Sequence, residues 1–140
     1  MTNLGRLKVL DTFYTLYLWR DFDAMQKFAT ARDARYQHKK EDANPIDGFC
    51  DYLSKEIHVF IDGYTHFKYF EMTLRHELTH AYLYEIGYSH HDDEELIDKI
   101  SKWIPQINNI FDQGKGLIDN ARTKEELASK KDSKESFSNC

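Results

Sequence analysis

Residues 73–98 read TLRHELTHAYLYEIGYSHHDDEELID and contain the motif His-Glu-Leu-Thr-His at positions 76 to 80. Side chains four residues apart lie on one face of a helix, so His76 and His80 can direct both imidazoles at one metal ion. Glu77 follows the first histidine and is close enough to hold a water molecule bound to that ion. Zinc suits such a site, because it accepts imidazole nitrogen and keeps a fourth position open for water. The motif therefore predicts a zinc-binding helix with Glu77 as a general base.

The residues around the motif favour a helix with two different faces. The segment from Phe70 to Ile86 has no proline or glycine, and apolar side chains recur every four residues, at Phe70, Leu74, Leu78 and Tyr82. This apolar stripe lies on the side away from both histidines. One face of the helix is therefore expected to pack on a core while the other carries the metal.

A second helix is expected to supply the third ligand. Asp92 or Asp93 is a suitable N-cap for it, and the apolar pattern continues with Leu96, Ile97, Ile100 and Ile104. Glu94 shares a face with Ile97, whereas Glu95 shares a face with lysines. Glu94 is therefore the predicted third ligand. Asp98, one turn further on, is expected to hydrogen-bond a ligating histidine and to fix its tautomer.

Other residues remain open for two of these roles. Glu95 is an alternative carboxylate ligand, and His90 or His91 would complete a three-histidine site, which is also good zinc chemistry. The group that would stabilise a developing oxyanion is not readable from the sequence. Its candidates are Tyr64, Tyr84, Tyr88, His90 and His91.

The run from Thr73 to Ala81, followed by Glu94 to Asp98, resembles the short gluzincins of the ImmA/IrrE-like metallopeptidase group, which phages and mobile elements often encode. The resemblance covers about residues 48–107. It implies a compact cytoplasmic zinc peptidase with a small sheet beside the motif helix and a ligand glutamate on the next helix. Peptidases of mobile elements in this group cleave regulatory proteins such as repressors. The segment Glu94–Asp98 departs from the group and is more similar to the E-x-x-x-D of thermolysin-type enzymes. A weaker resemblance is to SprT-like proteases, which have a third histidine.

The rest of the chain predicts an α+β, zincin-like domain over residues 1–119. A 3.6-residue apolar pattern from Asn3 to about Ala34 predicts one or two N-terminal helices. Residues 48–50 and 57–61 read as two strands of a hairpin with a turn between them. Pro105 is expected to end or kink the second helix. Residues 120–140 are polar and predict a solvated helix or a flexible tail.

Composition limits the partners of this chain. Its 140 residues carry a net charge of −5, so a nucleic acid is not an expected partner. No stretch is apolar and long enough for a transmembrane helix, and the N-terminal residues do not resemble a signal peptide. Cys50 and Cys140 do not suggest a disulfide framework, and a cytoplasmic location is expected. The expected partner is a protein or peptide substrate.

Two functions follow from these residues. The first is a zinc metallo-endopeptidase that hydrolyses a peptide bond with a zinc-activated water, acting on a regulatory or host protein. The alternative is a non-catalytic zinc-containing binding or inhibitor protein of a mobile element. Glu77 favours the enzyme, because a purely structural zinc site has no use for a base there and usually fills its fourth position with a protein ligand.

Overall fold

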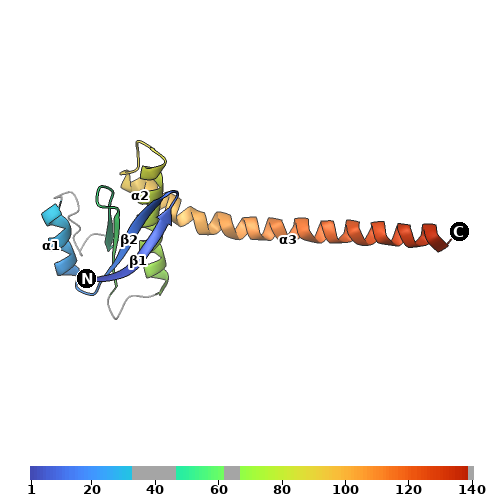
Figure 1. The fold of residues 1–140 in the computed structure, drawn as a ribbon, viewed down its shortest axis with the longest axis horizontal. Coiled ribbons are helices and arrows are strands. Elements are labelled where there is room, and N and C mark those ends of the chain that lie inside the picture. The colour runs from blue at the N-terminus through green and yellow to red at the C-terminus, as the bar shows by residue number, and fades with distance from the viewer. Residues whose placement is uncertain (33–46, 62–66, 139–140) are drawn as a thin grey trace. The chain divides into compact units, whose positions relative to one another are not determined.

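The computed structural model describes residues 1–32, 47–61 and 67–138, with the side chains of residues 67–69 and 132–138 left out. Tyr64, one of the oxyanion candidates, lies outside the described residues. The fold is α+β, as predicted, with a small mixed sheet and helices (Figure 1). The elements in chain order are β1 (Thr2–Val9), β2 (Thr12–Trp19), α1 (Phe22–Arg32), β3 (Gly48–Asp51), β4 (Glu56–Phe60), α2 (Phe67–Glu85) and α3 (Glu94–Ser138).

The four strands are arranged in the order β1-β2-β4-β3. The β1–β2 pair is antiparallel and its two-residue turn contains Leu10, which has a φ of 55°. The β2–β4 pair is parallel, and β3 is antiparallel to β4. The predicted hairpin over residues 48–61 is therefore confirmed, and β3 is a terminal strand of the sheet.

The predicted N-terminal helix is wrong over its first part, because residues 2–19 form β1 and β2. Residues 22–32 are helical, and the last residues of the predicted segment, 33 and 34, lie outside the described residues. The segment of β2 reads TFYTLYLW and is rich in aromatic side chains that favour strands. It lies inside the sheet and packs side chains on both faces. Such a strand has no simple alternation of apolar and polar residues, so periodicity alone does not distinguish it from a buried helix.

The two faces of the sheet carry two separate hydrophobic clusters. Ile57 and Val59 of β4 point to a cluster that includes Tyr14 of β2 and Ala81 of α2. Phe60 belongs to the other cluster, together with residues of β2, β3 and α1: Trp19, Phe22, Met25, Ala29 and Phe49. Helices α1 and α2 therefore cover opposite faces of the sheet (Figure 1).

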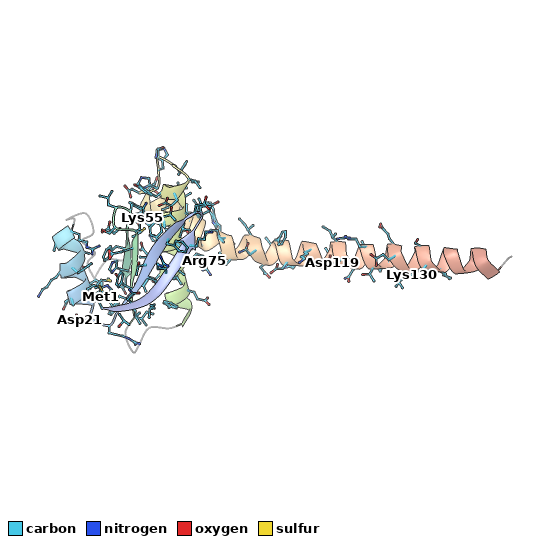
Figure 2. The ribbon with its side chains drawn as sticks, viewed as in Figure 1. Met1, Asp21, Lys55, Arg75, Asp119 and Lys130 are labelled. Carbon is cyan, nitrogen blue, oxygen red and sulfur yellow. The ribbon has the colours of Figure 1, made fainter. Side chains whose placement is uncertain are left out.

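A polar cluster fixes the C-terminal end of α2 to the strands. The carboxylate of Glu85 accepts hydrogen bonds from the hydroxyls of Thr12 and Tyr14, at 3.1 and 2.6 Å. It also pairs with the ammonium group of Lys55, at 2.6 Å (Figure 2 labels Lys55). These contacts come from three segments far apart in the sequence, so Glu85 fixes the helix against the sheet at the end that lies beyond the motif.

The predicted pair of helices, one with the motif and one with Glu94, is confirmed as α2 and α3. Ile97, the buried apolar residue of the first turns of α3, has no exposed surface. The chain forms two compact units, residues 1–102 and 103–140. The predicted domain boundary at residue 119 stays a prediction. Helix α3 continues through Pro105 and, as far as Ser138, through the segment predicted to be a solvated helix or a flexible tail. Good helix formers such as Lys, Glu and Ala are frequent there, and they favour continued helix.

None of the described helices has a stretch apolar and long enough to cross a membrane.

The cluster between α2 and the sheet is expected to dominate the stability of the first unit. Ile57 is fully buried in β4, so Ile57→Ala leaves a cavity and should lower the free energy of unfolding by about 2–5 kcal/mol. Leu53 is the control, because it is 89% exposed in the turn before β4. Leu53→Ala should change the free energy of unfolding by less than about 0.5 kcal/mol. Urea unfolding measures both. Equal losses in the two variants would contradict the placement of this core.

Candidate metal centre

The motif residues lie on the buried side of α2, not on a solvent-exposed face. His76, Glu77 and His80 are 2%, 3% and 5% exposed. Phe70, Leu74 and Leu78 of the predicted apolar stripe pack against the core cluster but are only partly buried. The most deeply buried face of α2 is the one that carries the histidines, whereas the prediction placed the core on the opposite face. Tyr82, the last residue of that stripe, is 49% exposed instead. The histidines are therefore enclosed by the fold, and their polar atoms need partners within the protein.

Three side chains converge on one point. The Nε2 atoms of His76 and His80 are 3.2 Å apart. The carboxylate of Glu94 approaches both, with one oxygen 2.9 Å from His76 Nε2 and the other 3.1 Å from His80 Nε2. Among the described residues, these three form the group of His, Cys, Asp or Glu side chains that could hold a metal ion.

The spacing of these atoms fits a small tetrahedral ion. Metal–nitrogen and metal–oxygen bonds of 2.0–2.1 Å at tetrahedral angles separate ligand atoms by about 3.3 Å. The three distances here, two of which join different oxygens of Glu94, are shorter than that by at most about 0.4 Å, so small side-chain shifts would make room for the ion. His76, His80 and Glu94 can therefore hold such an ion with one further position left for another ligand.

The charges in this group stabilise one another in the ion-free protein. Burial alone would raise the pKa of Glu94, but hydrogen bonds with His76 and His80 lower it well below its usual range. Burial alone would lower the pKa of His80, yet the bond with Glu94 and the nearby charge of Glu77 raise it to about 9. A protonated His80 beside an ionised Glu94 thus occupies the place that a cation would take.

Glu77 lies between α2 and β3, close to the metal-binding group but separate from it. Burial raises its pKa, and the charges of His80 and His76 oppose that rise. The Cγ of Glu77 would be 3.2 Å from a Cβ added to Gly48, and the carbonyl oxygen of His58 would be 2.6 Å away from it. Gly48 therefore allows the backbone of β3 to approach the Glu77 side chain. This role of Gly48 was not predicted from the sequence, although a glycine inside a predicted strand often marks such an approach.

Asp98 was predicted to hydrogen-bond a ligating histidine, but it pairs with a lysine, and other groups contact His80. The carboxylate of Asp98 pairs with Lys102 at 2.8 Å. On the inner side, Nδ1 of His80 is 2.7 Å from the carbonyl oxygen of His91 and 3.1 Å from the hydroxyl of Tyr52. A backbone carbonyl has no signature in the sequence, and Tyr52 lies 28 residues before His80, so motif reading could find neither partner.

The alternative third ligands are placed elsewhere. Glu95 is exposed and pairs with Lys99 at 3.0 Å. His90 is exposed and its ring contacts Tyr88. The ring of His91 packs edge-on against Tyr52 and Tyr84, and its Nδ1 lies 3.2 Å from Asp92. Of the four candidates, Glu94 is the one that the fold brings to both motif histidines.

Comparison of the chain with protein-family models, with curated proteins and with solved structures gave no match.

A side chain at position 48 should disturb the site of Glu77. Gly48→Ala places a Cβ against the His58 carbonyl, a backbone atom that cannot rotate away, and should lower the free energy of unfolding by about 1–3 kcal/mol. Gly114→Ala is the control, because a Cβ there meets no atom within 4 Å and helix propensity improves. Thermal unfolding compares the two. A Gly48→Ala protein as stable as wild type would contradict the close packing of position 48 against the His58 carbonyl.

Metal binding should depend on pH through His80. Because the folded pKa of His80 is raised from 6.5 to about 9, its proton stabilises the ion-free fold fully below pH 6.5 and progressively less up to pH 9. A metal ion must displace that proton, so affinity for Zn²⁺ should rise with pH from 6.5 to about 9 and then level off. Competition with a chromophoric chelator across this range measures the effect. A plateau that already begins at pH 7 would contradict the raised pKa.

Proposed function

We propose that this protein is a zinc-dependent endopeptidase whose metal ligands are His76, His80 and Glu94. The observation that carries the proposal is the convergence of these three side chains beside a buried carboxylate, Glu77, which is not one of the converging ligands. A site built only for structural stability would gain nothing from a second buried carboxylate. A hydrolytic site needs one as its base.

The chemistry of the ligands favours zinc. Two imidazoles and one carboxylate are the ligand set of several catalytic zinc sites, whereas magnesium and calcium prefer sites made of oxygen atoms. Bound zinc would lower the pKa of a coordinated water and polarise the carbonyl of the scissile bond. With three protein ligands, such a site retains a position for that water.

Glu77 is assigned the proton transfers of the reaction. Its carboxylate accepts a proton from the attacking water as the water oxygen bonds to the carbonyl carbon. It then delivers the proton to the amine nitrogen as the carbon–nitrogen bond breaks, which leaves a carboxylic acid and an amine. The acid then loses its proton to the amine or to solvent. Burial raises the pKa of Glu77, which is the direction expected for a carboxyl group that must deliver a proton as well as accept one.

The terminal strand β3 supports a peptide as substrate. Phe60 N donates to Asp47 O, so the alternation of an antiparallel pair directs the N–H and C=O groups of Phe49 and Asp51 to β4 as well. Those of Gly48 and Cys50 point to the opposite edge. An extended peptide added there as a further strand would pass Glu77, since Gly48 adjoins that side chain.

We further propose a folded or partly folded protein of the cytoplasm as the biological substrate, following the resemblance to peptidases of mobile elements that cleave regulatory proteins. The acidic character of the chain, with a net charge of −5, makes a nucleic acid a poor partner by comparison.

Glu77→Gln should separate zinc binding from hydrolysis. The amide cannot accept a proton from water, so hydrolysis should fall by at least about 100-fold while one zinc per chain is retained. Glu71→Gln, an exposed change on the same helix, is the control and should leave both properties unchanged. The measurements are metal content and cleavage of a mixture of fluorescence-quenched peptides and of unfolded casein.

Two outcomes would count against the proposal. If Glu77→Gln hydrolyses as fast as wild type, Glu77 is not the base. If wild type carries stoichiometric zinc but cleaves none of the probes, the non-catalytic zinc-binding alternative is favoured.

A further inference from the structure

The two motif histidines are supported differently behind the metal site. Nδ1 of His76 is buried and has no hydrogen-bond partner among the described residues. Nδ1 of His80 has two neighbours, the carbonyl oxygen of His91 at 2.7 Å and the hydroxyl of Tyr52 at 3.1 Å. The orientation of the metal-binding face therefore depends on the contacts of His80.

These contacts also determine where the proton of His80 is carried. A carbonyl oxygen can only accept, so Nδ1 must donate, and Nε2 is then the atom available to a metal ion. The Tyr52 hydroxyl lies 3.4 Å from the same His91 oxygen and can donate to it while sharing the Nδ1 proton.

The ring of Tyr52 fixes the position of that carbonyl. It stacks on Tyr84 of α2, with ring centroids 4.5 Å apart and an angle of 7° between the planes. The ring of His91 meets both tyrosines edge-on, at 4.8 Å from Tyr52 and 5.1 Å from Tyr84. Three rings from the turn after β3, from α2 and from the connection between the helices thus pack as one group.

The same connection leads to the third ligand. Asp93 caps α3, since its side chain accepts a hydrogen bond from Leu96 N at 3.1 Å. Glu94 follows immediately, and its side chain is 63% exposed. An exposed glutamate at a helix start has little packing of its own to hold it. Its place opposite the histidines therefore depends on how the connection is attached to α2.

We propose that Tyr52 is a positioning residue of the metal centre, which acts through its hydroxyl on His80 and through its ring on the connection that carries Glu94. It does not contact the ion-binding atoms and takes no part in proton transfer. The inference rests on the proposed function only in assuming that the centre binds zinc. The turn between β3 and β4, which lies outside the motif, thereby supports the metal centre.

Two substitutions separate the two actions of Tyr52. Tyr52→Phe removes the hydroxyl and keeps the stack on Tyr84, so affinity for Zn²⁺ should fall about 10-fold, as when an outer partner of a metal ligand is lost. Tyr52→Leu also removes the aromatic stack, and the fall should approach 100-fold. Both effects should appear with zinc alone, in the absence of any peptide.

The matched control removes a different buried tyrosine hydroxyl. Tyr14→Phe loses a 2.6 Å hydrogen bond to Glu85, and among the described residues neither Tyr14 nor Glu85 is hydrogen-bonded to a converging ligand. It should lower the melting temperature of the ion-free protein and leave zinc affinity within two-fold of wild type. A variant that merely weakens the fold therefore behaves differently from one that displaces a ligand.

The experiment measures the dissociation constant of zinc by competition with a chromophoric chelator, at a temperature where every ion-free variant is folded by circular dichroism. Weaker binding by Tyr52→Phe, but not by Tyr14→Phe, supports the positioning role. Zinc affinity of Tyr52→Phe within two-fold of wild type overturns it, whatever the peptidase assay shows. A wild type that binds zinc and cleaves nothing refutes the proposed function and leaves this inference standing. A wild type that binds no zinc refutes both.

Discussion

The packing of α2 against the sheet determines the environment of every polar group in the candidate metal centre. Ala81 has no exposed surface and lies in the cluster with Tyr14 and the inner residues of β4. One turn before it, Glu77 faces the backbone of β3 at Gly48. Because that side of the helix is buried and His76 and His80 are one turn apart, both rings lie in the same enclosed space.

Such an enclosure is costly for charged groups unless they compensate one another. Glu77, His80 and Glu94 do this in the ion-free protein, where a proton on His80 balances nearby carboxylates. The arrangement is not the most stable that the fold could have, because apolar residues of similar volume would avoid the cost of desolvation. A buried group of this kind is typical of a site that binds a cation or moves a proton.

The support of the site comes from segments that are distant in the sequence. Tyr52 belongs to the turn between β3 and β4, and His91 to the connection between α2 and α3, yet both meet His80. The contacts among Tyr52, His91 and His80 connect the buried side of the centre, on α2, to its more exposed side at Glu94. The geometry of the ligands is thus a property of the whole first unit, residues 1–102.

The sequence by itself determined the features that local periodicity encodes: the motif helix, the hairpin before it, a helix start at Asp92 or Asp93, and Glu94 on the face that includes Ile97. The structure places the N-cap at Asp93. Only the tertiary structure decided that residues 2–19 form strands, because β2 is flanked by β1 and by the distant strand β4 and is apolar on both faces. It likewise decided that Gly48, Tyr52 and the His91 carbonyl surround the centre while Asp98 pairs with Lys102. Strand pairing and backbone acceptors depend on contacts between distant residues, and a backbone carbonyl is the same in every residue, so no motif can reveal them.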